Sequence, residues 1–144
     1  MTEDFWKHLE RMPHDIVAYC IFPFLGPETL VWTSKTNYNT HNNVIRSLIS
    51  NSDVESYIRT LVRKDYSFVF EHVIRENIQR WLKMSRYRYN NQLAVDYLHF
   101  IYYYAGEQRS NKCEELINHL ACEMLGSKWH KRNGVRSIRT KWNA

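Results

Sequence analysis

The chain has 144 residues, of which 44% are hydrophobic and 15% aromatic, and its formal net charge is +5. This length suits one domain, or a small module with an appendage, and the apolar content is ample for a core. No window reaches the roughly 18–20 apolar residues that a membrane-spanning helix needs, and the N-terminal residues MTEDFWKHLE include acids where a secretory signal is basic. Three scattered cysteines are too few for a disulfide framework, so we expect an intracellular protein.

The charge is divided unevenly along the chain. Residues 1–56 carry seven acidic and four basic side chains, a net charge of −3, whereas residues 57–144 carry eight acidic and sixteen basic side chains, a net charge of +8. A slightly acidic front and a basic back predict two surfaces that contact different partners.

The first predicted elements lie in a proline-punctuated segment, residues 12–39, with the sequence MPHDIVAYCIFPFLGPETLVWTSKTNYN. Pro13 suits the first turn of a helix, and Gly26-Pro27 predicts the end of that helix and the start of a second one. A third short helix is expected over residues 44–49. Because such a stretch is too small to close a core, we expect an exposed apolar patch built from residues 12–32.

The rest of the chain is predicted to be helical. No proline follows Pro27, and glycine occurs only at four positions, so turn residues are too sparse for long sheets. Apolar side chains recur at helical spacing over residues 57–62, 69–82, 93–104 and 113–125. Ser110-Asn111 are the expected caps at the start of the last of these helices, and Gly126 is expected at its C-terminal end. We therefore predict an all-α fold of roughly six or seven helices, with breaks at residues 50–53, 88–91 and 106–111.

The proline-punctuated segment resembles the F-box, a small helical module that docks the Skp-type adaptor of cullin–RING ubiquitin ligases. Met12-Pro13 stands where the family has Leu-Pro, and Ser34-Lys35 leads to Tyr38 where the family usually has Trp. The resemblance covers roughly a quarter of the chain. It implies that the chain binds a Skp-type subunit through Met12, Pro13, Ile16, Val17, Ile21, Phe22, Phe24, Leu25 and Leu30.

The layout of the whole chain is similar to short F-box-like proteins that large DNA viruses encode in families. This resemblance implies a family of related proteins that act in an infected host cell, in its cytoplasm or nucleus. Together with the patterns above, we expect a three-helix F-box-like module at residues 1–50, a helical domain at 51–127 and a basic C-terminal segment at 128–144. The F-box resemblance implies a non-enzymatic adaptor. The helical C-terminal part would then present an unknown target protein for ubiquitylation.

Motifs for catalysis and metal binding are missing from the sequence. It has no Gly-x-Ser-x-Gly elbow, no glycine-rich phosphate loop and no His-Glu-x-x-His pattern. The best metal candidate is the set Cys113, His119, Cys122 and His130, but its spacing matches no zinc module, and the cysteines fit positions in a helix core. We therefore expect no enzymatic activity, no cofactor and no metal.

The basic C-terminal segment suggests an alternative function. It interleaves Trp129 and Trp142 with Lys128, Lys131, Arg132, Arg136, Arg139 and Lys141. Cations that meet phosphates and rings that stack on bases are the composition of a nucleic-acid contact. We favour instead a solvated last helix in which Val135 and Ile138 pack against the core. A third alternative is a helical interaction protein without a link to ubiquitin.

Overall fold

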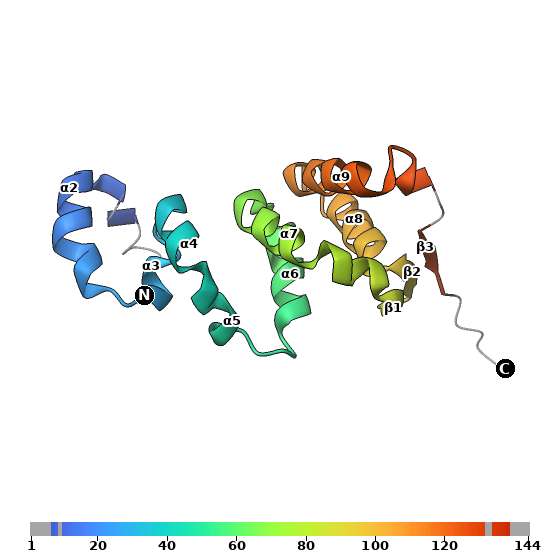
Figure 1. Cartoon of the computed structure of the whole chain (residues 1–144), viewed down its shortest axis with the longest axis horizontal. Helices are drawn as coiled ribbons and strands as arrows, with labels where there is room; N and C mark the ends of the chain where they lie inside the picture. The colour runs from blue at the N-terminus through green and yellow to red at the C-terminus, as the bar shows by residue number, and fades with distance from the viewer. Residues whose placement is uncertain (1–6, 9, 132–133, 139–144) are drawn as a thin grey trace. The chain divides into compact units, whose positions relative to one another are not determined.

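The computed structural model describes residues 7–8, 10–131 and 134–138. The chain forms two compact units, Met1–Ser52 and Asp53–Ala144 (Figure 1). The boundary falls in the polar stretch 50–53, one of the places where the sequence predicts a break.

The first unit consists of short helical segments joined by tight turns. Three helices were predicted here, but the structure divides the same residues into smaller pieces. They are α2 (His14–Ile16), the π-helical turn η1 (Val17–Ile21), the 3₁₀ turn η2 (Phe22–Phe24), α3 (Pro27–Leu30), α4 (Lys35–His41), the 3₁₀ turn η3 (Asn42–Val44) and α5 (Ile45–Leu48).

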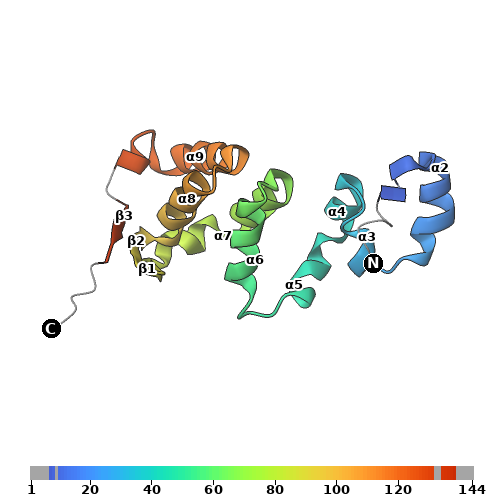
Figure 2. The same ribbon diagram turned by 180° about the vertical axis from the view of Figure 1, so that it is seen from behind.

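The second unit combines four longer helices with a small sheet. Its elements are α6 (Val54–Arg63), α7 (Ser67–Lys83), β1 (Ser85–Tyr89), β2 (Gln92–Asp96), α8 (Tyr97–Glu107), α9 (Asn111–Leu125), the 3₁₀ turn η4 (Trp129–Lys131) and β3 (Val135–Ser137). Figures 1 and 2 show α8 and α9 side by side, with the sheet at one end of α8.

The sheet corrects the prediction of an all-α fold, which is wrong. It has three antiparallel strands in the order β1-β2-β3. The sequence SRYRY-NN-QLAVD alternates between residues that face the core and residues that face solvent, and Asn90-Asn91 forms a two-residue hairpin loop with Asn90 at φ 50°. Asparagine tolerates this left-handed conformation, so residues 88–91, predicted as a break, are a hairpin turn.

The helix predicted over residues 93–104 starts later than expected, because strand β2 takes up its first residues. Leu93 and Ala94 belong to β2, and the helix begins at Tyr97. The side chain of Asp96 accepts a hydrogen bond from the backbone N–H of His99 at 2.9 Å, which is the geometry of an N-cap. The strand therefore runs directly into the helix without a loop.

The prediction of a last helix that contains Val135 and Ile138 is also wrong, because Val135–Ser137 forms strand β3. Its residues pair with β2 in the register Leu93↔Arg136 and Ala94↔Val135. The backbone N–H of Ile138 donates to the carbonyl of Asn91 at 2.6 Å. The described part of the basic segment is thus built into the second unit.

The core of the second unit is rich in aromatic rings. Trp81 and Tyr97 are edge to face at 5.0 Å between centroids, and Tyr87 lies 4.8 Å from Tyr97. Tyr87 also donates its hydroxyl to Glu55 of α6 at 2.8 Å, and the guanidinium of Arg59 lies over the ring of Tyr89 at 4.6 Å. These contacts attach α6 to the inner face of β1.

Among the described residues, no helix has the length and apolar character required to cross a membrane.

Candidate partner-docking site

Pro13 starts the helical part of the candidate docking segment. Its carbonyl accepts hydrogen bonds from the backbone N–H groups of Ile16 at 3.1 Å and Val17 at 3.2 Å. Proline loses nothing at this position because the first N–H groups of a helix have no partner inside the helix. Asp15 lies in the first turn, where the helix end favours negative charge.

The backbone changes from α- to π-helical geometry at Val17–Ile21, just before Pro23. The N–H of Phe22 donates to the carbonyl of Val17, five residues earlier. Pro23 has no N–H, and its ring would collide with the carbonyl four residues before it, so a regular α-helix cannot continue. The wider turn and the 3₁₀ turn Phe22–Phe24 that follows it end the segment.

Gly26 and Ser34 begin the next two helices. The carbonyl of Gly26 accepts from the N–H groups of Thr29 and Leu30, both at 3.0 Å, and Pro27 occupies the first helical position, as the sequence predicts. The hydroxyl of Ser34 accepts from the N–H of Asn37 at 3.1 Å and caps α4. These turns and caps fix where each short helix begins, and so the direction in which its apolar side chains point.

The interior of this unit is small. Among its described residues, the buried apolar side chains are those of Val17, Val31, Tyr38 and Ile45. A core of this size contributes little stability on its own, because a unit of about 50 residues buries only a modest fraction of its surface. The other described apolar side chains of the unit are therefore partly or fully exposed to solvent.

The structure divides the nine predicted docking residues into three groups. Met12, Pro13, Ile16 and Phe24 are exposed, with exposed fractions of 48% for Ile16 and 86% for Phe24. Val17 is buried. The remaining four, which are half-buried, are Ile21, Phe22, Leu25 and Leu30.

Two further residues of the same segment were missed by the sequence analysis. Tyr19 is 79% exposed and Trp32 is 45% exposed. Among the described residues, five of the eleven large hydrophobic side chains that are exposed lie in the segment 12–32. Both residues are hydrophobic, and the sequence shows this. Their exposure, however, depends on the π-helical turn that holds Tyr19 and on the end of α3 next to Trp32.

The structure places the predicted nucleic-acid-binding residues of the C-terminal segment in different environments. Lys128 and Lys131 are exposed, and Arg136 lies on β3. Trp129 is buried, with its ring 4.9 Å from Tyr102, so it is not exposed for stacking on a base. The other predicted residues lie outside the described part of the chain: Arg132, Arg139, Lys141 and Trp142.

A buried Asp–His pair was also missed by the sequence analysis. Nδ1 of His99 lies 2.9 Å from the Asp96 carboxylate, and Nε2 lies 3.3 Å from the carbonyl of Trp129. Both ring nitrogens face acceptors of the protein itself, so the pair joins α8 to η4 and is not arranged to take a proton from a substrate. No group of three or more His, Cys, Asp or Glu side chains that could hold a metal ion occurs among the described residues.

No protein-family model, no curated protein and no solved structure matches the chain. The F-box-like interpretation therefore depends on the residues of the N-terminal segment and on their exposure.

Proposed function

We propose that the chain is an F-box-like adaptor that docks a Skp-type subunit of a cullin–RING ubiquitin ligase through residues 12–32. Its second unit presents a target protein. The adaptor contributes no chemistry of its own and acts in the cytoplasm or nucleus of a host cell.

The observation that carries this proposal is the exposure of large apolar side chains in one short segment. Ile16, Tyr19 and Phe24 are exposed, and the described residues of their unit bury only four apolar side chains. Exposed apolar groups of this number are characteristic of interaction sites, because their contact with water costs about 25 cal/mol per Å² until a partner covers them. Three of the exposed residues, Tyr19, Phe24 and Trp32, are aromatic, and Tyr and Trp are common among the residues that contribute most to binding at interfaces.

The test is direct binding of the purified full chain to a purified Skp-type adaptor, measured by isothermal titration calorimetry. Phe24→Asp and Ile16→Asp place a charge in the interface, and each should weaken binding by about 100-fold or more. Both side chains are exposed in the free chain, so neither substitution should change its thermal unfolding.

Leu48→Asp is the matched control, because Leu48 is 49% exposed in the same unit but lies outside the segment. It should leave binding unchanged. The proposal fails if the folded wild-type chain does not bind the adaptor, or if Leu48→Asp weakens binding as much as Ile16→Asp does. A complex that forms with another protein instead would favour a helical interaction protein without a ubiquitin link.

A further inference from the structure

The solvent-facing side of the small sheet combines cationic and aliphatic side chains. Tyr87 and Tyr89 of β1 face the core, and the strand alternation directs Arg88, which lies between them, to the other side. Arg86 lies on that side as well. Leu93 and Val95 of β2 lie on that same side, and Val95 is 51% exposed.

The strand register places these side chains in order across the sheet. Arg88 on β1 and Arg136 on β3 are both cross-strand partners of Leu93. Cross-strand partners have Cβ atoms roughly 4.5–5.5 Å apart, so this row holds an aliphatic side chain between two guanidinium groups. Arg86 and Val95 lie on the same face, beyond this row.

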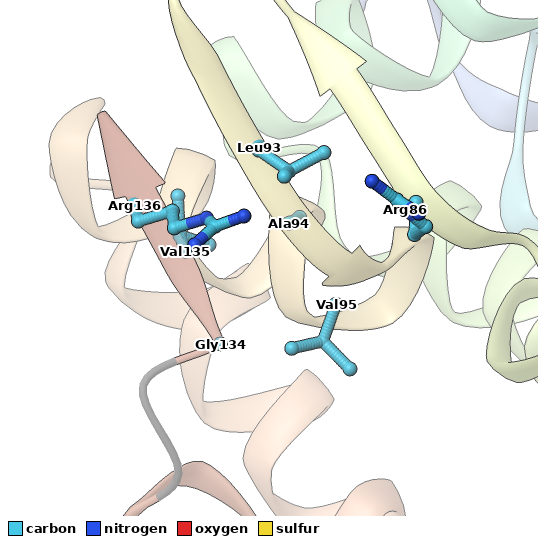
Figure 3. Close-up of a pocket in the computed structure, with 7 residues that line it drawn as sticks. All are labelled: Arg86, Leu93, Ala94, Val95, Gly134, Val135 and Arg136. Atoms are coloured by element: carbon cyan, nitrogen blue, oxygen red, sulfur yellow. The ribbon is translucent and has the colours of Figure 1, made fainter. Parts of the chain in front are cut away.

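An open depression of about 660 Å³ lies over this face. Figure 3 shows Arg86 and Arg136 on opposite sides of it, with Leu93 and Val95 between them. This volume is within the range of about 300–1,000 Å³ that ligand sites occupy. The depression therefore has an aliphatic floor and a cationic rim.

The arginines of this face have no acidic partner among the residues that the structure describes. Among the described residues, none of Arg86, Arg88 and Arg136 forms an ion pair. Arg75 of α7, by contrast, lies 2.9 Å from Glu71 of its own helix. Unpaired guanidinium groups that share one face repel one another, and carboxylates of a ligand would bind them in bidentate geometry.

Arg86 has an additional feature. Its backbone is in the left-handed region, at φ 56°, which disfavours a residue with a side chain. Residues held in this conformation within a strand occur where a side chain must be redirected, and here the side chain lies at the depression.

We propose that this face binds a short acidic peptide segment of a partner protein in which aliphatic residues alternate with Asp or Glu. Its carboxylates pair with Arg86, Arg88 and Arg136, and an aliphatic side chain packs on Leu93 and Val95. Single-stranded nucleic acid fits less well, because it binds through aromatic platforms and the tyrosines of this sheet face the core. The inference concerns the second unit alone and does not depend on adaptor docking.

The test uses the full chain and a fluorescein-labelled peptide of repeated Asp-Leu-Glu-Val units, with binding measured by fluorescence anisotropy. Arg86→Ala together with Arg136→Ala should weaken binding by about tenfold or more, the effect of losing charge-assisted hydrogen bonds. Arg86→Gly together with Arg136→Ala should have the same effect without backbone strain. The control, Arg80→Ala with Lys83→Ala, removes two exposed charges from α7 and should change binding by less than about twofold.

The aliphatic floor is tested separately. Val95→Ser should weaken binding of the Asp-Leu-Glu-Val peptide by roughly three- to tenfold, and should not affect a peptide of repeated Asp-Ser-Glu-Ser units. The serine peptide itself should bind more weakly to the wild-type chain.

Several results would overturn the inference. They are equal affinity for the two peptides, an equal loss in the control pair, and no binding of the acidic peptide. Tighter binding of a single-stranded oligonucleotide of matched charge, lost with Arg86 and Arg136, would assign the face to nucleic acid. A dimer in light scattering that the same substitutions dissociate would assign it to a second copy of the chain.

Discussion

The side-chain carboxylate of Asp65 accepts a hydrogen bond of 2.9 Å from the backbone N–H of Cys113, although 48 positions separate the two residues. Its second oxygen accepts from the N–H of Lys112 at 3.3 Å. Asp65, in the turn after α6, therefore caps the N-terminus of α9. The sequence instead predicts a cap from Ser110-Asn111, at the start of α9 itself. The hydroxyl of Ser110 instead donates to the carbonyl of Val62.

This cap predicts an acid-sensitive contribution to stability. Burial raises the pKa of the Asp65 carboxyl, but the hydrogen bonds from Cys113 and Lys112 outweigh that effect and hold the pKa below its ordinary value of 3.8. Because the folded-state pKa is depressed, the contribution is present above the unfolded-state pKa and is lost as the pH falls below about 4.

Asp65→Ala should lower the free energy of unfolding by about 1 kcal/mol at neutral pH, as loss of an N-cap does. The difference from wild type should shrink near pH 3, roughly one unit below the ordinary pKa of an Asp carboxyl, in urea unfolding followed by circular dichroism. Glu115→Ala, on the exposed face of α9, is the control and should leave the free energy of unfolding at neutral pH almost unchanged. An Asp65→Ala difference that is constant with pH would contradict the assignment.

The three cysteines should differ in reactivity. Burial, together with the Asp65 carboxylate, raises the pKa of the Cys113 thiol to about 12, so the reactive thiolate is scarce at neutral pH. Cys20 is exposed, and Cys122 is half-buried with its thiol directed to Asn118. Iodoacetamide should modify Cys20 first and Cys113 only in urea, as peptide mass spectrometry over time would show. Equal labelling of Cys113 and Cys20 in the native chain would refute this.

Gly134 lies against the ring of His99, and this contact predicts an intolerance of side chains. A Cβ at position 134 would be 2.4 Å from Cδ2 of His99. Gly134→Ala should therefore cost about 1–3 kcal/mol in the free energy of unfolding, the range for overpacking a core. Gly106→Ala is the matched control, because a Cβ there would be 3.8 Å from its nearest neighbour in a helix, and it should stabilise the chain by up to about 1 kcal/mol.

The hydrogen bond between Tyr87 and Glu55 predicts that β1 and α6 stabilise each other. Burial and the Glu55 carboxylate raise the pKa of Tyr87, which therefore donates its proton across the physiological range. Tyr87→Phe should cost about 1–2 kcal/mol in chemical unfolding. Tyr66→Phe, at a ring that is exposed after α6, should cost nothing measurable. A double-mutant cycle with Glu55→Gln isolates the pair, and a coupling energy of zero would exclude it.

The sequence by itself determined those features that depend on residues close together in the chain. The fixed φ of proline placed helix starts at Pro13 and Pro27, and apolar side chains at helical spacing identified α7 and α9. Gly126 has φ 89° at the end of α9, as the sequence predicts, because glycine adopts this conformation without steric cost. These rules act over a few residues, so a single sequence suffices for them.

Only the tertiary structure decided where strands form. Leu93 and Ala94 fit a helical stripe with Tyr97, and Val135 with Ile138 fits one helical turn. Both segments are strands because β1, β2 and β3 supply one another's backbone hydrogen bonds. Alternation and the Asn90-Asn91 turn favour the hairpin of β1 and β2, but β3 is distant in sequence from β2, and local spacing does not encode their pairing.

The candidate docking site shows the same division between local and long-range information. The sequence identified its apolar residues, but Ile16 and Val17, which are adjacent and similar in hydrophobicity, have opposite exposure. Burial is set by the neighbours that the folded chain brings to each side chain. Which apolar groups are core and which are free for a partner was therefore decided by packing.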